Sequence, residues 1–363
     1  MSEMTSRERV ELAYKHQEPD RVPIVFDEFR VGERLTDDPE QRARQVIDDA
    51  SRKVGRFHSD IIRMGEALFE EAWGAKVDYT EGKRGADLQA GFLKSVEDWE
   101  KLWVLDPHKD GKLPVAVKTT EIISRRFGNE RWLSEGCHSP IAFLIRLRPG
   151  SEGFTDLVLH PDLVKKGLKT ITESIIEYMK VLADAGINDF RISSTRWDRA
   201  FYTAEQMEEF EVPYINEILK NATRLGLYVT MAMLELQNPH LDLMMKLQSL
   251  GCFVHLVEIP PMGLGALKEK YGKKLGFYIP LFPTFGVRHF NGEEERYSAV
   301  LIKGKPNEVY EAVKERMRIG APGGGFMVSL QTQPRFASPA PIPVENVEAA
   351  VKAYEEYGKY PIK

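Results

Sequence analysis

The chain has 363 residues, of which 42% are hydrophobic and 29% are charged, and its formal net charge is −5. This length can bury a large core in one large domain or in two small ones. The slightly acidic balance argues against a nucleic-acid-binding surface, which would be basic, and two cysteines are too few for a secreted disulfide scaffold.

The first residues are polar and charged, which argues against a signal peptide. No apolar run reaches the ~18 residues typical of a membrane span. We therefore expect a soluble, cytoplasmic protein with neither a nucleic-acid nor a membrane partner.

Strands and helices are predicted to alternate along the whole chain, after a first helix over residues 6–17 that lies outside the main fold. Short apolar or β-branched runs predict eight strands, at residues 22–26, 59–64, 131–135, 188–193, 227–233, 252–257, 275–281 and 325–331. Amphipathic stretches predict the helices, at residues 40–55, 112–128, 161–185, 204–225, 241–250, 263–272, 306–319 and 344–357.

Several helix ends have the expected chemistry. Asp162 and Thr203 are suited to N-caps, and Pro343 is suited to a helix start. Glycines follow the predicted helix ends at positions 186, 226 and 251.

The alternation predicts right-handed βα units and a parallel sheet, and eight such units predict an α/β protein with a closed (β/α)8 barrel, also called a TIM barrel. We expect one domain over residues 1–363, with an N-terminal helical extension and a long polar insertion near residues 66–112. An open doubly wound sheet is the weaker alternative, because no glycine-rich dinucleotide turn follows an early strand.

Barrels of this type place their chemistry at the carboxyl ends of the strands. The residues that follow the predicted strands there are acidic and rich in imidazole: Asp27, Glu28, Glu135, Glu235, Glu258, His138, His240 and His289. Crowded carboxylates repel one another unless they share a proton or a cation, and zinc accepts both imidazole and carboxylate ligands. The alternative is a solvated rim, in which the carboxylates pair with Arg30, Arg63, Arg196 and Arg288.

Other candidate residues have a structural interpretation. His255 lies inside an apolar run and is expected to be a core histidine, and Cys252 is expected to pack in a buried strand. Cys137 precedes His138, but adjacent residues on a strand point to opposite faces, which disfavours a Cys–His nucleophile.

Residues 106–111 fit the pattern D-x-H-x-x-G of corrinoid-binding domains. Such a domain needs its own doubly wound sheet, and this segment lies in the polar insertion. We therefore interpret it as an ordinary turn, and we expect any corrinoid to be carried on a separate protein.

Segments along nearly the whole chain resemble the uroporphyrinogen decarboxylase superfamily in their order and spacing. They are residues 7–13, 19–23, 154–164, 183–186, 210–214 and the C-terminal stretch 323–361. The resemblance implies a β/α barrel and one of two chemistries, which are decarboxylation and corrinoid-linked methyl transfer.

Two branches of the superfamily fit this sequence poorly. True uroporphyrinogen decarboxylases carry an R-Q-A-G-R signature, whereas acidic Asp27 and Glu28 stand in the matching stretch and would repel a polycarboxylate. Thiol-directed methyltransferases hold zinc with a His-x-Cys and a later Cys. The matching positions here resemble Glu235-Leu236-Gln237, and the last strand has Phe326 and Met327 but no Cys.

A third branch transfers a methyl group from an ether, often a methoxylated aromatic, to a cobalt(I) corrinoid protein. This resemblance implies that Glu235, Glu258 and His289 gather around the leaving oxygen, directly or through zinc. A cobalamin or other corrinoid on a separate protein would accept the methyl group. Candidate substrate-binding residues are Phe26, Met233 and Phe326, which would hold the ring, and Asp27, Glu28, Arg30, His138, Arg196 and Gln331.

Two other functions stay open: a cofactor-independent decarboxylase or lyase acting on a small carboxylic acid, and a non-enzymatic protein that binds a corrinoid protein. Dimers are common among such barrels, but the sequence shows no interface, so a homodimer stays open too.

Overall fold

The computed structural model describes most of the chain, namely residues 3–26, 38–57, 59–66, 68–78, 87–90, 92–148, 151–194, 197–233, 238–247, 252–256, 262–281, 287–288, 294–295, 300–301, 304–330 and 343–362.

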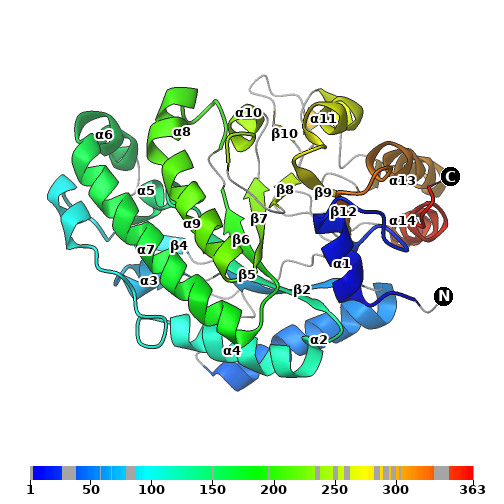
Figure 1. Ribbon diagram of the computed structural model, residues 1–363, viewed down its shortest axis with the longest axis horizontal. Helices are drawn as coiled ribbons and strands as arrows, with labels where there is room; N and C mark the ends of the chain where they lie inside the picture. Colours follow the sequence, from blue (N-terminus) through cyan, green and yellow to red (C-terminus); the bar gives the residue numbers. More distant parts are fainter. Residues whose placement is uncertain are drawn as a thin grey trace.

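Eight parallel strands form a nearly closed barrel surrounded by helices (Figure 1). The strands are β1 (Ile24–Phe26), β2 (Ile61–Glu66), β5 (Trp132–His138), β6 (Asp189–Ser193), β7 (Tyr228–Met233), β8 (Cys252–Leu256), β9 (Gly276–Pro280) and β12 (Phe326–Leu330). Their spatial order is β1-β12-β9-β8-β7-β6-β5-β2. The amide of Asp60, just before β2, donates to the carbonyl of Ile24 on β1 at 2.8 Å, which brings the two ends of this order together. The predicted (β/α)8 barrel and its eight strands are confirmed.

Helices lie between successive strands, as predicted. They are α2 (Pro39–Phe57), α4 (Leu113–Phe127), α7 (Pro161–Ala185), α8 (Ala204–Phe210), α9 (Val212–Arg224), α10 (Leu241–Met244), α11 (Gly263–Tyr271), α13 (Pro306–Gly320) and α14 (Val344–Tyr357). Two short helices, α5 (Ala142–Leu147) and α6 (Glu152–Leu159), precede α7. Within the described ranges, none of the helices is long and apolar enough to cross a membrane.

One predicted helix, residues 204–225, is divided into α8 and α9. Glu211 breaks it with φ −130° and ψ −51°, and Pro213 lies in the first turn of α9. A continuous helix would need the amide hydrogen that proline lacks, so the chain starts a new helix instead.

The predicted caps are confirmed in part. Thr203 forms a capping box with Gln206, and Gly186 ends α7 with φ +100° in the left-handed region. Asp162 is not an N-cap, because α7 begins one residue earlier, at Pro161. Its negative charge in the first turn still suits the helix dipole. Gly251 lies outside the described residues.

The N-terminal helix α1 (Ser6–Tyr14) is shorter than predicted, because His16 adopts a positive φ of 54°. It also does not lie apart from the barrel. Its residues Val10, Ala13 and Tyr14 pack in one buried cluster with strand residues that include Trp132 and Phe253. Helix α1 therefore closes the amino end of the barrel.

The predicted insertion contains α3 (Phe69–Ala72), the antiparallel pair β3 (Lys76–Asp78) and β4 (Asp87–Ala90), and the 3-10 helix η2 (Val96–Lys101). A second antiparallel pair, β10 (Val287–Arg288) and β11 (Glu294–Glu295), follows β9. Trp99 attaches the insertion to the barrel helices. Its indole donates to Asp156 at 2.9 Å, and its ring packs so closely on α7 that an added Cβ at Gly167 would lie 2.5 Å from it.

The segment that fits D-x-H-x-x-G is a turn, as interpreted. The amide of Asp110 donates to the carbonyl of Asp106 at 2.9 Å, and the amide of His108 donates to the Asp106 carboxylate at 2.9 Å.

A buried carboxylate, Asp60, joins the two ends of the chain. It accepts hydrogen bonds from Arg9 of α1 at 2.7 Å, from Arg21 at 2.7 Å and from the amide of Ile24 at 2.9 Å. Arg21 also donates to the hydroxyl of Tyr354 on α14 at 2.7 Å. Because α1, β1, β2 and α14 all meet at this group, Asp60 holds the seam of the barrel together.

We predict that Asp60→Asn lowers the free energy of unfolding by about 3–5 kcal/mol, because it leaves two guanidinium groups without their shared counter-charge. Urea denaturation monitored by circular dichroism measures this change. The matched control is Asp184→Asn on the exposed surface of α7, which should change the value by less than about 0.5 kcal/mol. Equal losses in the two variants would contradict the prediction.

Candidate active site

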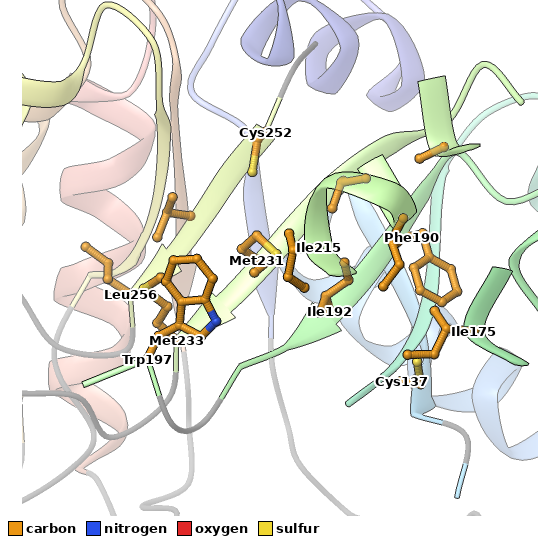
Figure 2. Close-up of a cluster of buried hydrophobic side chains, with 14 of the residues drawn as sticks. Cys137, Ile175, Phe190, Ile192, Trp197, Ile215, Met231, Met233, Cys252 and Leu256 are labelled. Atoms are coloured by element: carbon orange, nitrogen blue, oxygen red, sulfur yellow. The ribbon is translucent and has the colours of Figure 1, made fainter. Parts of the chain in front are cut away.

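Side chains on each barrel strand alternate between the interior and the surrounding helices. On β5, Trp132 belongs to the cluster inside the amino end, whereas Leu133 and Cys137 belong to the core that faces the helices. Figure 2 shows Cys137 in that outer core with Ile175 and Phe190. Since His138 has the opposite parity, it faces the interior, and the predicted separation of Cys137 from His138 is confirmed.

The amino end of the interior is sealed by an aromatic and polar network. Tyr14 stacks on Trp132 with ring centroids 5.3 Å apart, and its hydroxyl lies 2.6 Å from the Thr230 hydroxyl. Asp189 accepts hydrogen bonds from the Trp132 indole at 2.7 Å and from Ser134 at 3.2 Å. Burial raises the pKa of the Asp189 carboxyl above its ordinary value. This network is the floor of the barrel.

Above the floor, a stack of three side chains crosses the interior. The guanidinium of Arg63 lies over the ring of Tyr278, 4.9 Å from its centroid. On β8, His255 stacks on Tyr278 with centroids 4.0 Å apart and an interplanar angle of 18°. His255 is a buried interior residue, as predicted. Arg63 lies in the middle of β2, so its placement in a solvated rim is wrong.

The last inward positions of the strands carry small or polar side chains. His138 ends β5 and is 9% exposed, and Ser193 ends β6 with no exposure. Ala232 and Ser329 occupy comparable inward positions on β7 and β12, and both are buried. Arg191 also faces inward, two residues before Ser193.

Glu211 holds two of the loops that follow the strands. Its carboxylate accepts hydrogen bonds from the amide of Ile141, after β5, at 2.8 Å and from the indole of Trp197, after β6, at 3.0 Å. Burial raises the pKa of the Glu211 carboxyl to about 7. The carboxyl therefore changes its charge near neutral pH while it joins both loops.

The loops after β6 and β7 are joined to each other as well. Asp198 accepts a hydrogen bond from the amide of Asn238 at 2.6 Å, and the imidazole Nε2 of His240 donates to the carbonyl of Tyr202 at 2.8 Å. Burial lowers the pKa of His240, which favours its neutral form. His240 therefore fastens these two loops together. This structural contact explains why a histidine follows β7.

Two predicted substrate-binding residues face away from the interior. Met233 lies in the outer core, where Figure 2 shows it beside Trp197 and Leu256. Phe326 is the first residue of β12, and its ring packs against α13 so closely that an added Cβ at Gly320 would lie 2.3 Å from it. Because both side chains point toward the helices, neither can hold a substrate ring inside the barrel.

His138 is the predicted substrate-binding residue that the structure places at the carboxyl end of the interior. The backbone of Phe26 ends β1. The other predicted site residues lie outside the described residues, so they stay predictions: Asp27, Glu28, Arg30, Arg196, Glu235, Glu258, His289 and Gln331.

The three tentative zinc ligands, Glu235, Glu258 and His289, are among these residues. In the described part of the chain, no group of three or more His, Cys, Asp or Glu residues is arranged to hold a metal ion. Cys252 is buried, and burial raises the pKa of its thiol to about 12. A thiol that stays protonated supports the packing role predicted for it.

Arg191 and Tyr278 are interior residues that do not lie at strand ends, so the strand-end positions do not reveal them. The sequence does carry a signal for Arg191. In the stretch Asp189-Phe190-Arg191-Ile192-Ser193, polar residues alternate strictly with apolar ones, which indicates a polar barrel interior.

A nearly closed parallel barrel, with polar side chains facing inward near the carboxyl ends of its strands, is typical of (β/α)8-barrel enzymes. The model of the uroporphyrinogen decarboxylase (URO-D) family matches residues 5–256, which is more than half of the chain. The protein therefore belongs to the URO-D family.

Among solved structures, a methyltransferase from Methanosarcina mazei is similar over 98% of this chain and 99% of its own, with a TM-score of 0.73 and 20% sequence identity. A B12-independent methionine synthase from a Shewanella species covers 87% of this chain and 85% of its own, with a TM-score of 0.46 and 9% identity. A search of curated proteins gives no significant match.

We predict that Glu211 makes the protein less stable as pH rises. Its pKa is about 7 in the folded protein against an ordinary value of 4.5, so its stabilising contribution is complete below about pH 4.5 and is lost through pH 7. Relative to Glu211→Gln, the wild type should lose about 2–3 kcal/mol of unfolding free energy between about pH 5 and about pH 9. Urea denaturation across this range measures the difference.

The control is Glu217→Gln on the exposed side of α9, which should follow the wild-type pH dependence. The prediction fails if the unfolding free energy of Glu211→Gln changes with pH in the same way as that of the wild type.

Proposed function

We propose that this protein is a methyltransferase that takes a methyl group from a methyl ether, such as a methoxylated aromatic, and passes it to the cobalt(I) of a corrinoid on a separate protein. Membership of the URO-D family supports a barrel active site, and the Methanosarcina methyltransferase offers a parallel for methyl transfer on this fold. The observation that carries the proposal is Glu235-Leu236-Gln237, which stands where related thiol-directed enzymes have His-x-Cys.

The proposed reaction breaks the bond between the methyl carbon and the ether oxygen. The methyl carbon forms a new bond to cobalt. The ether oxygen keeps the electron pair of the broken bond and takes up a proton. An ether oxygen leaves poorly unless a proton or a Lewis acid stabilises its developing charge. We assign this task to Glu235, Glu258 and His289. Zinc, where these residues hold it, supplies Lewis acidity at the same oxygen.

The described residues support such a reaction by shielding and positioning. Tyr14 and the stack on Tyr278 fill the barrel below the site, on the side of its amino end. Glu211 and Asp198 fasten the loops that follow β5, β6 and β7. Rigid loops keep reacting groups in place, which is a large part of catalysis when a partner protein delivers one reactant.

A decarboxylase or lyase acting on a small carboxylic acid is the second candidate. The observation in its favour is a pair of arginines that face the barrel interior, the partly buried Arg63 and the buried Arg191, since guanidinium groups suit carboxylate substrates. The acidic residues Asp27 and Glu28 still disfavour the polycarboxylate porphyrinogens.

We predict that purified protein transfers methyl groups from a methoxylated aromatic to free cob(I)alamin, and that Glu235→Ala lowers the rate by about 100-fold or more because the oxygen loses its acid or its metal. The absorbance change of cob(I)alamin measures the rate. Plasma mass spectrometry of the same samples measures zinc, which should be about one per chain and should be lost in Glu235→Ala and His289→Ala.

The control variant is Glu269→Ala on the exposed face of α11, which should leave both rate and zinc content unchanged. Undiminished transfer by Glu235→Ala would remove this residue from the mechanism. Release of carbon dioxide from a carboxylated substrate, without any methyl transfer, would favour the second candidate.

A further inference from the structure

A single buried carboxyl, that of Glu211, connects three loops at the carboxyl end of the barrel. It lies at the break between α8 and α9 with no exposure, and it accepts hydrogen bonds from the amide of Ile141 at 2.8 Å and from the indole of Trp197 at 3.0 Å. The carbonyl of Trp197 in turn accepts a hydrogen bond from the amide of His240 at 2.9 Å. The loops after β5, β6 and β7 are therefore connected through this one group.

The same connection reaches an interior residue. Ile141 follows the inward-facing His138 by three residues, and between them the amide of Ser139 donates to the carbonyl of Ser193 at 3.0 Å. Residues 138–141 are thus held at one point by strand β6 and at another by Glu211. The position of His138 at the carboxyl end of the interior depends on both contacts.

Glu211 has no cationic partner among the residues that the structure describes. Burial raises the pKa of its carboxyl to about 7, and the nearby donors of Trp197, Ser139 and Ile141 offset this effect only in part. A buried carboxylate without a counter-charge is costly, and this cost is relieved when the group moves into water. Ionisation of Glu211 therefore favours an arrangement in which the carboxylate has left the two donors.

The junction between α8 and α9 is suited to such a movement. Helix α8 has only seven residues, and Glu211 interrupts the helical path with φ −130° and ψ −51°. Pro213 has no amide hydrogen that could continue the ladder across the break. Hinges often lie at the ends of elements of this kind, so a shift here leaves most backbone hydrogen bonds intact.

Other titratable groups lie on the elements around Glu211, namely Glu209 on α8, Tyr214 on α9, His138 at the end of β5, Asp198 after β6 and His240 after β7. Burial raises the pKa of Tyr214 to about 12, so its hydroxyl stays neutral. Burial lowers the pKa of His240 from its ordinary value of 6.5, so its imidazole is neutral near about pH 7. Glu209 pairs with Lys165 at 2.6 Å on the surface. Substitution of Glu211 separates its titration from that of His138 and Asp198.

We propose that Glu211 is a positioning residue that regulates this site: its neutral carboxyl holds the loops after β5, β6 and β7 in place, and its ionisation loosens them. His138 then keeps its position under mildly acidic conditions and loses it as the pH rises. The loosening itself does not depend on the proposed function. Its effect on methyl transfer rests on that function.

Hydrogen exchange of the Ile141 amide measures the loosening, because this amide is protected by its hydrogen bond to Glu211. After correction for the intrinsic effect of pH on exchange, protection in the wild type should fall about 10- to 100-fold between about pH 5 and about pH 8 and should level off above about pH 7. Glu211→Gln cannot ionise, so its protection should stay constant. Glu217→Gln, on the exposed side of α9, should follow the wild type.

Constant protection in the wild type overturns the inference. So does an equal fall in Glu211→Gln, because another group such as His138 would then be titrating. Protection of Ile141 that equals the protection of amides inside β6 would mean that the loops open only with the whole fold, and this result also overturns the inference.

Should Glu211→Gln fail to fold, Trp197→Phe decides. This variant removes a donor that favours the ionised carboxyl, so protection should level off at a higher pH than in the wild type. Protection that levels off at the wild-type pH overturns the inference.

Methyl transfer to cob(I)alamin gives a second readout. The ratio of kcat/KM in the wild type to kcat/KM in Glu211→Gln should fall as the pH rises from about 5 to about 8, because only the wild type loses its loop contacts. A constant ratio overturns the regulatory role. Loosening of the loops without any methyl transfer removes the proposed function and leaves the role of Glu211 in the loops. Methyl transfer with constant protection of Ile141 does the reverse.

Discussion

The closure of the barrel depends on one buried carboxylate. Asp60 accepts hydrogen bonds from Arg9, Arg21 and the amide of Ile24, and through Arg21 it reaches Tyr354 of the last helix. A parallel barrel closes only if its first and last strands are held in register. Here polar contacts supply that restraint, because β1 is three residues long and contributes few ladder hydrogen bonds. The geometry at the opposite end of the barrel, where the chemistry is expected, follows from this closure.

The two ends of the barrel are built differently. Helix α1 seals the amino end with Tyr14, and the polar groups there are satisfied by one another. At the carboxyl end, Glu211 and Asp198 each accept hydrogen bonds from more than one position and so hold loops from different βα units. Buried carboxylates are stable only when several donors meet them, so these loops and carboxylates depend on one another.

The elements of the fold could be predicted from the sequence because strand and helix periods are local. The division of the helix at Glu211 differs from the predicted single helix, although Pro213 in the sequence indicates a new helix start there. Contacts between distant residues, such as Arg9 with Asp60, leave no local pattern. The candidate site was less predictable, since a strand end does not reveal which face a side chain takes. Phe326, for example, was expected to hold a substrate ring in the barrel interior, but its ring packs against helix α13.

The proposed acceptor limits how a substrate can lie in this site. A corrinoid on a separate protein cannot enter a barrel whose interior is filled by Tyr278, His255 and Arg63, so the methyl carbon has to face the loops. The other end of the substrate then points into the interior, toward these three side chains. An ether that enters the barrel from this side has the direction of its carbon–oxygen bond fixed, which is the orientation that in-line methyl transfer requires.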